Sequence, residues 1–375
     1  LLDGTVQTCP HLLLESQRTN LVTYSESFSN AYWTKTNSSI TSNAAISPDG
    51  TLNADKLVED TSNGTHELEV TGLAVVADKY TISLFAKASE RGKIQIKLRN
   101  YFAGDPNVIF DLENGTFQQN AQAIGSMTLL SNGFYKCTFT TVLNAIAGGN
   151  AILNINLVDE ANQTSYQGDG TSGVYIFGAM LEQGSYPTSY IVSNSGSATT
   201  RLAEVCNGSG NASTFNSSEG VLFAQIGALA DDSSLRWMTI SDGVSHTNGS
   251  VELYFNTVSN TIEYTYRTAG PVTQYDASVL LTDITLSNKI AITWKLNEFK
   301  FYVNGILKNT SLLGNVNLPN VFKQLDFYRS TAFNFYGKTK QIQVFDSALT
   351  DSELETLTSW MSFSDMAIDL NYTIQ

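Results

Sequence analysis

Residues Lys93–Tyr101 read KIQIKLRNY, a stretch in which apolar and polar side chains alternate. Ile94, Ile96 and Leu98 fall on one face of an extended chain, and the basic and polar residues between them fall on the opposite face. This period of two predicts a β-strand with one buried and one outward face. Ala151–Val158 alternates in the same way, so a second half-buried strand is expected there.

Turn-forming residues separate these short strands. Asn114-Gly115 lies between Phe110–Leu112 and Thr116–Gln118, and Asn-Gly readily adopts the positive φ angles of a type I′ turn, which predicts a β-hairpin. Further strands follow at close spacing without an intervening helical period. This arrangement favours an antiparallel sandwich or barrel, so the predicted fold class is all-β.

The composition favours two domains of this class and excludes some partners. A chain of 375 residues exceeds the size at which a single hydrophobic core usually keeps growing. The formal net charge of −14, without a run of Lys or Arg, would repel phosphate backbones and anionic lipids. Nucleic acid and membrane surfaces are therefore not expected as partners, and no segment is apolar for the roughly 18 to 20 residues that cross a bilayer.

The three cysteines, Cys9, Cys137 and Cys206, are far apart and form no C-x-x-C pair. One disulfide with a remaining thiol is one interpretation. The favoured interpretation is that all three are buried and act as small apolar side chains. Neither interpretation implies a metal site.

We predict two tandem antiparallel β-sandwiches and one short C-terminal helix. The helix is expected because Thr350 and Glu353 form a capping box and Leu354, Leu357 and Met361 follow at helical spacing. The predicted boundaries are a lead-in segment at 1–20, a first sandwich at 21–195, a linker at 196–218, a second sandwich at 219–361 and a tail at 362–375.

The tail carries apolar residues in strict alternation. We expect this segment to pair either with an edge of this chain or with a neighbouring subunit. The alternating residues are Ile368, Leu370, Tyr372 and Ile374.

Catalytic motifs are missing from the sequence. His11, His66 and His246 stand in no nucleophile-elbow or metalloprotease motif, and ordinary surface or turn positions are expected for them. Glycanases of the lectin-like type carry an E-x-D-x-x-E strand, and no such strand occurs. A non-enzyme is therefore predicted, with a hydrolase or lyase built from carboxylates on different loops as the alternative.

Carbohydrate binding requires planar polar side chains and aromatic faces, and two groups of residues offer them. The first group lies on the outward faces of the two alternating strands, and its plainer interpretation is a merely solvated sheet face. The second group lies on later strands, where most aromatic residues belong to the core. The predicted ligand-binding residues are Lys97, Arg99, Tyr101, Asn154 and Asn156 in the first group and Trp237, Tyr254 and Arg267 in the second.

Calcium is the one cofactor that the sequence suggests. Asp169 in Gly168-Asp169-Gly170 and Glu182 near the end of the first sandwich are candidate oxygen ligands. A tight turn explains Asp169 equally well.

Two blocks at opposite ends of residues 12–201 resemble a carbohydrate-binding-module-like jelly roll, a module of phage tail proteins and bacterial surface proteins. The first block is Leu12–Glu15, Gln17–Leu21, Ser47–Thr51 and Ala54–Leu57, and the second is Gly173–Glu182, Tyr186–Ile191 and Thr200-Arg201.

Residues 219–361 resemble the concanavalin A-like, laminin-G-like sandwich. The resemblance rests on Phe299–Gly305 and on Ile342–Leu349 followed by Thr350–Leu354. Its catalytic relatives are glycanases whose acidic strand motif is missing here, so the resemblance implies adhesion rather than hydrolysis.

Together the two resemblances imply a receptor-binding or adhesive protein that recognises surface glycans, with a phage spike, tail fibre or virion-surface component as the leading case. The expected location is the virion surface or the extracellular space, and the expected partners are a host or environmental polysaccharide, other virion proteins and further copies of the chain. Two alternatives stay open: the carbohydrate-binding portion of a secreted bacterial polysaccharide-degrading enzyme, and a purely structural virion protein.

Overall fold

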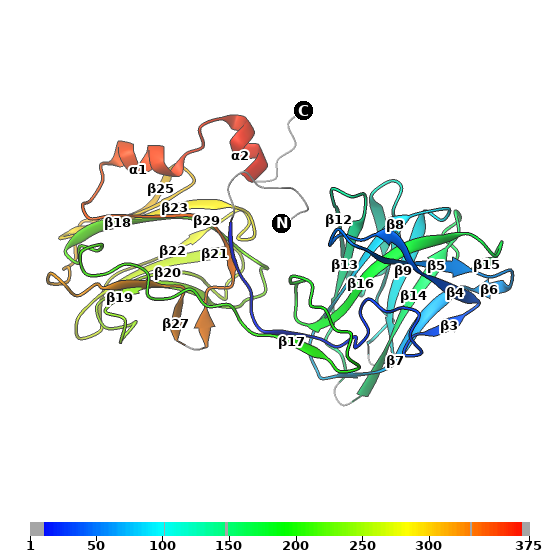
Figure 1. Ribbon diagram of the computed structural model, residues 1–375. Helices are drawn as coiled ribbons and strands as arrows, with labels where there is room; N and C mark the ends of the chain where they lie inside the picture. The colour runs from blue at the N-terminus through cyan, green and yellow to red at the C-terminus, as the bar shows by residue number, and fades with distance from the viewer. Residues whose placement is uncertain (1–10, 101, 147–148, 331, 370–375) are drawn as a thin grey trace. The chain divides into compact units, whose positions relative to one another are not determined.

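The computed structural model describes residues 11–100, 102–146, 149–330 and 332–369, which form two compact units (Figure 1). The first unit contains 17–202, and the second contains 203–369 together with 11–16. Both units are built from antiparallel strands, as the sequence predicts.

The first unit is a sandwich of two six-stranded sheets, which we call sheets 1 and 2. Sheet 1 has the order β11 (Thr116–Gln119), β10 (Asn107–Asp111), β9 (Lys93–Arg99), β14 (Gly149–Val158), β7 (Glu67–Val75) and β3 (Thr34–Thr36). Sheet 2 has the order β12 (Ala123–Leu129), β13 (Tyr135–Thr141), β8 (Tyr80–Ala88), β16 (Gly173–Gln183), β5 (Leu52–Glu59) and β4 (Ser38–Ile46). Two small pairs complete it, β15 (Ser165–Gln167) with β6 (Asn63–Thr65) and β17 (Thr199–Arg201) with β2 (Arg18–Asn20).

The inner faces of these two sheets form one continuous core. Ile94, Ile96 and Leu98 of β9 are fully buried in it, which confirms the inward face predicted from their alternation. Removing these apolar surfaces from water is the main favourable contribution to the fold, at about 25 cal/mol per Å².

The β10–β11 hairpin is confirmed, but its predicted turn type is wrong. Asp111 pairs with Thr116, so four residues rather than two connect the strands, and of these four Gly115 alone has a positive φ, of 65°. The Asp111 carboxylate accepts hydrogen bonds from the backbone nitrogens of Glu113 and Asn114, and this local capping stabilises the longer turn.

The second unit is a sandwich of sheets 3 and 4. Sheet 3 has the order β1 (Leu12–Leu14), β29 (Gly337–Phe345), β18 (Glu219–Ala228), β23 (Asn288–Lys295), β24 (Glu298–Val303) and β25 (Ile306–Ser311). Sheet 4 has the order β22 (Val272–Leu280), β21 (Thr261–Thr268), β20 (Ser250–Phe255), β19 (Arg236–Ser241) and β26 (Gln324–Asp326), and a small hairpin, β27 (Tyr328–Ser330) with β28 (Phe333–Asn334), follows it.

Aromatic side chains dominate the core between sheets 3 and 4. Trp294, Tyr264 and Tyr266 are fully buried there. Tyr264 donates its hydroxyl to the backbone carbonyl of Thr293 at 2.7 Å, and Tyr266 donates to that of Ser217 at 2.9 Å, so both of these phenols are satisfied.

The segments predicted as a lead-in (1–20) and a linker (196–218) both contain residues that pair or pack with the sandwiches. In the lead-in, β1 pairs with β29 of sheet 3, and β2 pairs with β17 of the first unit. In the segment 196–218, Ser209 exchanges backbone hydrogen bonds with Leu325, and the ring of Phe215 is buried in the second core.

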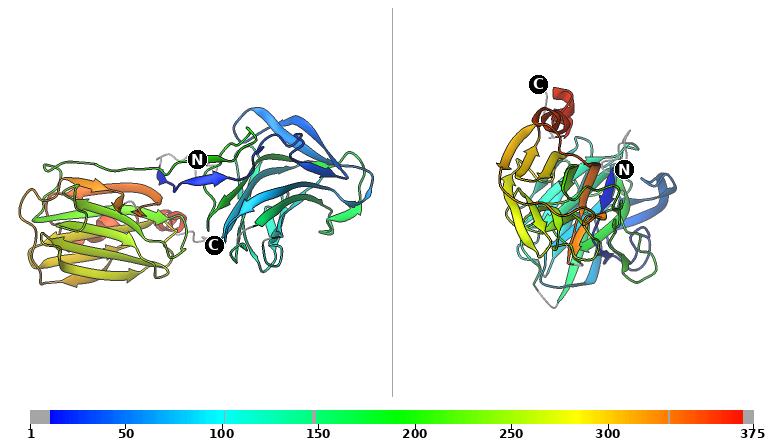
Figure 2. Two further views of the ribbon diagram at one scale, coloured as in Figure 1. Left: turned by 90° about the horizontal axis from the view of Figure 1, so that it is seen from below. Right: turned by 90° about the vertical axis from the view of Figure 1, so that its left-hand side faces the viewer.

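Two C-terminal helices, rather than the one predicted, lie outside sheet 3 (Figures 1 and 2). The capping box of α1 (Asp351–Thr358) is confirmed, since Thr350 accepts from the backbone nitrogen of Glu353 while the Glu353 carboxylate accepts from that of Thr350. Leu354 is buried as predicted, but Met361 is 95% exposed beyond the helix end and takes no part in the apolar stripe.

The second helix, α2 (Phe363–Asp369), lies in the predicted tail and contains Ile368, the first of its four alternating apolar residues. The Ser362 side chain accepts from the backbone nitrogen of Asp365 and so caps the helix. Its last residue, Asp369, accepts from Lys340, Gln225 and Trp360, which fixes the helix on sheet 3 of this same chain. Of the four alternating residues, Leu370, Tyr372 and Ile374 lie outside the described residues.

Candidate functional site

The outward face of sheet 1 brings together the first group of predicted binding residues. Lys97 on β9 lies opposite Asn154 on β14, so the two alternating strands are neighbours in sheet 1. On its other side Asn154 lies opposite Glu69 on β7. We call this set the polar face: Glu67, Glu69, Gln95, Lys97, Arg99, Asn154 and Asn156.

A guanidinium and an amide at the centre of the polar face hold each other in place. Arg99 donates from Nε to Oδ1 of Asn154 at 2.7 Å and from a terminal nitrogen to the carboxylate of Glu69. The Asn154 amide nitrogen in turn donates to Glu67 at 3.0 Å and to Glu69 at 3.2 Å. These bonds fix the planes of the four side chains relative to one another.

Neighbouring residues extend this network along the strands. The Asn156 amide donates to Oε1 of Gln95 at 2.8 Å, and Lys97 forms an ion pair of 3.1 Å with Asp105. Oδ1 of Asn156 has no hydrogen-bond partner in the part of the chain that the structure describes.

Exposure separates residues that a ligand can touch from residues that support them. Asn154 and Asn156 are only 1% and 4% exposed, although they point away from the core, because longer side chains cover them. The side chains of Arg99 and Lys97 are 35% and 29% exposed. Tyr101, the fifth predicted residue of this group, lies outside the described residues.

Glu67 and Glu69 belong to the polar face but were missed by the sequence analysis. The signal was available, because Glu67-Leu68-Glu69-Val70 alternates polar and apolar residues and Leu68 and Val70 are fully buried. Burial, reinforced by the like charge of Glu69, raises the pKa of Glu67 above its ordinary value.

The second predicted group lies on the outward face of sheet 4. Trp237 on β19 and Tyr254 on β20 pair across the strands, with ring centroids 4.2 Å apart. The guanidinium of Arg329 lies 4.4 Å from the centre of the Trp237 ring, and Arg267 donates to the carboxylate of Glu252 at 2.9 Å.

The side chains of the second unit close this aromatic cluster themselves. Trp237 is 5% exposed and packs edge-on against Phe333 of β28, at 5.2 Å between centroids. Its indole nitrogen has no hydrogen-bond partner among the described residues. Burial raises the pKa of Tyr254, which also donates to Glu263. The cluster is therefore less accessible to a ligand than the polar face.

Of the two candidate calcium ligands, Asp169 lies in the loop before β16 and Glu182 lies within β16, near its end. The Asp169 carboxylate accepts from the backbone nitrogens of Thr171 and Ser172, both at 2.7 Å, and with the Ser172 hydroxyl these bonds hold its pKa below the ordinary value. Glu182 is buried and accepts from the nitrogen and hydroxyl of Thr188.

Both carboxylates thus have partners within the chain. Across the described ranges, no group of three or more His, Cys, Asp or Glu side chains is placed to hold a metal ion. Calcium binding stays a prediction.

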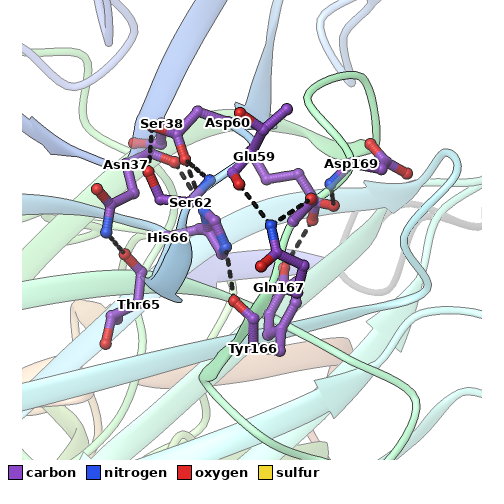
Figure 3. A network of polar contacts seen from close by, with 12 residues as sticks. Asn37, Ser38, Glu59, Asp60, Ser62, Thr65, His66, Tyr166, Gln167 and Asp169 are labelled. Atoms are coloured by element: carbon purple, nitrogen blue, oxygen red, sulfur yellow. Dashed lines mark hydrogen bonds and ion pairs between the residues drawn. The ribbon is translucent and has the colours of Figure 1, made fainter.

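Asp169 also borders a buried network centred on Glu59 (Figure 3). Arg91 donates two hydrogen bonds to the Glu59 carboxylate, at 2.6 and 2.8 Å, and the Tyr166 hydroxyl donates a third at 2.7 Å. The Asp169 backbone nitrogen adds a fourth at 2.9 Å. This network ties the loop before β16 to the end of β5.

Two histidines expected at surface or turn positions are buried instead. His66 is fully buried, with Nδ1 2.7 Å from the carbonyl oxygen of Asn37 and Nε2 3.3 Å from that of Tyr166 (Figure 3). His246 is 8% exposed and lies 2.8 Å from the carboxylate of Asp326. Each has polar partners that only the tertiary fold supplies, so its sequence neighbours carried no signal.

Cys137 and Cys206 are both free thiols. Burial raises the pKa of each, so both favour the neutral form over the reactive thiolate. Cys137 is fully buried in the first core, in line with the favoured interpretation, but Cys206 is only partly buried, and Cys9 lies outside the described residues.

None of the helices described is both long and apolar enough to span a bilayer. No protein-family model matches the chain, and no curated protein matches its sequence.

Solved structures similar to this chain come from several sources. One is the CBM40 module of a sialidase from Ruminococcus gnavus bound to α2,3-sialyllactose, with 16% identity, a TM-score of 0.33, and 42% of this chain and 95% of that chain covered. A pentraxin from Limulus polyphemus has 11% identity and a TM-score of 0.34, with 42% and 76% covered. The LG4-5 domains of mouse laminin α1 have 10% identity and a TM-score of 0.28, with 76% and 86% covered.

Proposed function

We propose that this chain is a non-catalytic glycan-binding protein and that the polar face of sheet 1 is its binding surface. The observation that carries the proposal is the fixed geometry of Arg99, which is held by Glu69 and Asn154 while its side chain stays 35% exposed. Sugar hydroxyls are recognised by planar polar groups, and a group that is already ordered loses little conformational entropy on binding.

The exposed members of the polar face make the direct contacts in this proposal. Arg99, Lys97 and Gln95 meet the ligand, whereas the buried amides of Asn154 and Asn156 position them. Trp237, Tyr254 and Arg267 form a second, less accessible site on sheet 4.

The biological setting that we propose is host attachment. The chain would act as a phage spike, tail-fibre or virion-surface component in contact with a host polysaccharide and other virion proteins. Each sandwich offers a shallow surface of modest affinity, so a homo-oligomer would gain avidity by presenting several copies at once. Calcium bound near Asp169 would be accessory.

A glycan array tests this function directly. The whole chain at neutral pH is expected to bind a restricted set of glycans, and Arg99→Ala is expected to lower that binding at least tenfold with an unchanged circular dichroism spectrum. Lys308→Ala is the matched control, because Lys308 is an exposed cation on β25 of the other sandwich. An empty array together with tight binding to a virion protein would instead identify a purely structural protein.

Glycoside hydrolysis is the second candidate function, and one observation favours it. Glu67 and Glu69 lie on one face of β7 and both accept from the same Asn154 amide nitrogen, and paired carboxylates are the usual groups of glycosidases. Against it, the Glu69 carboxylate is already engaged by Arg99. Incubation with bacterial and algal polysaccharides is expected to yield no new reducing ends, and their appearance in wild type but not in Glu67→Gln would establish hydrolysis.

A further inference from the structure

We infer that the polar face selects uncharged, hydroxyl-rich glycans and excludes anionic ones that carry sialic acid, uronic acid or sulfate. This inference rests on the proposed function, because it names the ligand class of the same surface. It follows from how the cations of β9 are paired.

Each cation on the outward face of β9 already has a carboxylate partner. Arg99 pairs with Glu69, and Lys97 pairs with Asp105 at 3.1 Å. Lys93 lies 3.9 Å from the carboxylate of Glu160 and also donates to the side chain of Asn162 at 3.0 Å. An anionic sugar is bound through charge-assisted hydrogen bonds from Arg or Lys, so on this face it has to displace a carboxylate that is already in place.

The two carboxylates of the polar face lie close to a single ion-paired cation, because Arg99 pairs with Glu69 while Lys97 pairs with Asp105 outside the face. Glu67 has no ion-pair partner in the described part of the chain, and its carboxylate lies beside that of Glu69 on the same strand face. An acidic group that approached Arg99 would meet the Glu69 carboxylate that Arg99 already binds, with the charge of Glu67 nearby. Like charges at an interface oppose binding and are a common means of rejecting the wrong partner. The net charge of −14 adds repulsion at longer range.

The groups that remain free suit neutral sugars. Arg99 uses Nε and one terminal nitrogen within the chain, which leaves further N–H groups to donate to a ligand. Glu67 and Glu69 are partly exposed and have lone pairs that can accept hydroxyl protons. A sugar hydroxyl both donates and accepts, so it can bridge such neighbouring donors and acceptors without bringing a charge.

An array that carries matched neutral, sialylated, uronate and sulfated glycans tests this selectivity. Wild type is expected to bind neutral glycans at least tenfold better than their acidic counterparts. Glu69→Gln removes the carboxylate from Arg99, and it is expected to gain at least tenfold in binding to carboxylated glycans. Asp105→Asn, at a half-exposed position, frees Lys97 in the same way and provides a second route if Glu69→Gln folds poorly.

The control is Glu113→Gln, which removes one negative charge from an exposed turn of the same sandwich. It is expected to leave the ratio of neutral to acidic binding unchanged. Preferential binding of acidic glycans by wild type would overturn the inference but leave the proposed function standing. If Glu69→Gln and Asp105→Asn both fold well but neither gains binding to acidic glycans, the inference is likewise overturned and the proposed function still stands. A wild-type chain that binds no glycan of any class would overturn the proposed function itself.

Discussion

Arg99 and Asn154, on adjacent strands of sheet 1, are joined by a 2.7 Å hydrogen bond from the guanidinium Nε to the amide Oδ1. The bond is almost completely shielded from water on the amide side, because Asn154 is 1% exposed. The orientation of the exposed guanidinium therefore depends on a residue that a ligand does not touch.

Replacing Asn154 with Leu tests this dependence. Leu keeps the branched shape of the side chain but leaves Arg99 and the two glutamates without their shared partner, and an unsatisfied buried polar group costs about 1 to 3 kcal/mol. We expect the free energy of unfolding to fall by that amount in urea titrations, and glycan binding to fall with it. The control is Gln118→Leu, on the exposed edge strand β11 of the same sheet. This change should alter the free energy of unfolding by less than about 0.5 kcal/mol.

The raised pKa of Glu67 predicts a pH-dependent difference between wild type and Glu67→Gln. The folded chain binds this proton more tightly than the unfolded chain, so ionised Glu67 opposes folding at pH 7 and stops opposing it as the pH falls through the folded-state value, which lies above the ordinary 4.5. We expect Glu67→Gln to be more stable than wild type at pH 7, and the difference to vanish near pH 4. A difference that grows on acidification would contradict the shift.

Local periodicity was sufficient to predict the inward and outward faces of β9 and β14, because side-chain direction in a strand depends only on residue parity. It could not show that β7 lies beside β14, since strand neighbours are chosen by the whole topology. Glu67 and Glu69 were therefore missed as partners of Asn154. For the same reason the sequence did not show that Asn154 and Asn156, although outward, are covered by longer neighbours.

The tail and the lead-in show a different limit. The tail begins with a helix over 363–369 that the sequence did not predict, and the Ser362 cap and the contacts of Asp369 stabilise it. Leu12–Leu14 is too short to carry a period, and its place beside β29 depends on a partner more than 300 residues away. Contacts at such separation cannot be deduced from either segment alone.

The Glu59 network predicts a large cost for one small substitution. Glu59 accepts two hydrogen bonds from Arg91 and one each from Tyr166 and Asp169, and its side chain is fully buried. Glu59→Gln removes the negative charge and leaves Arg91 without its counter-ion, and breaking a buried ion pair in this way costs about 3 to 5 kcal/mol. Glu160→Gln, with a side chain that is 70% exposed, is the control and should be nearly neutral.

The same network gives a pH signature. Burial alone would raise the pKa of Glu59, but its hydrogen bonds from Arg91, Tyr166 and Asp169 outweigh burial and hold the pKa below the ordinary value of 4.5. Its contribution to stability is therefore complete above about pH 5 and is lost as the pH falls through the folded-state value. The difference between wild type and Glu59→Gln, measured by urea unfolding, should shrink below pH 4.

The side chain of Asp369 attaches helix α2 to sheet 3. Its carboxylate accepts from Gln225 at 2.9 Å, from Trp360 at 2.9 Å and from Lys340 at 3.0 Å. Asp369→Ala should release the helix and increase amide hydrogen exchange over 363–369, while the core strands of sheet 3 keep their protection. Asp365→Ala, on the exposed side of the same helix, should leave that docking intact, and equal exchange in the two variants would contradict the role of Asp369.

Strand β1 joins sheet 3 although more than 180 residues separate it from the rest of the second unit. Leu14 is 4% exposed in the second core, whereas Leu12 on the same strand is 40% exposed. Leu14→Ala should therefore destabilise the second unit by about 2 to 5 kcal/mol, and Leu12→Ala by less than about 1 kcal/mol.

Tryptophan fluorescence can assign this effect to the correct unit. Of the four tryptophans, Trp33 alone belongs to the first unit, so a Trp33→Phe background reports only on the second. In that background Leu14→Ala should lower the urea midpoint of the fluorescence transition and Leu12→Ala should barely move it. Equal shifts for the two variants would mean that β1 does not complete sheet 3 in solution, because only a paired strand buries alternate residues against a core.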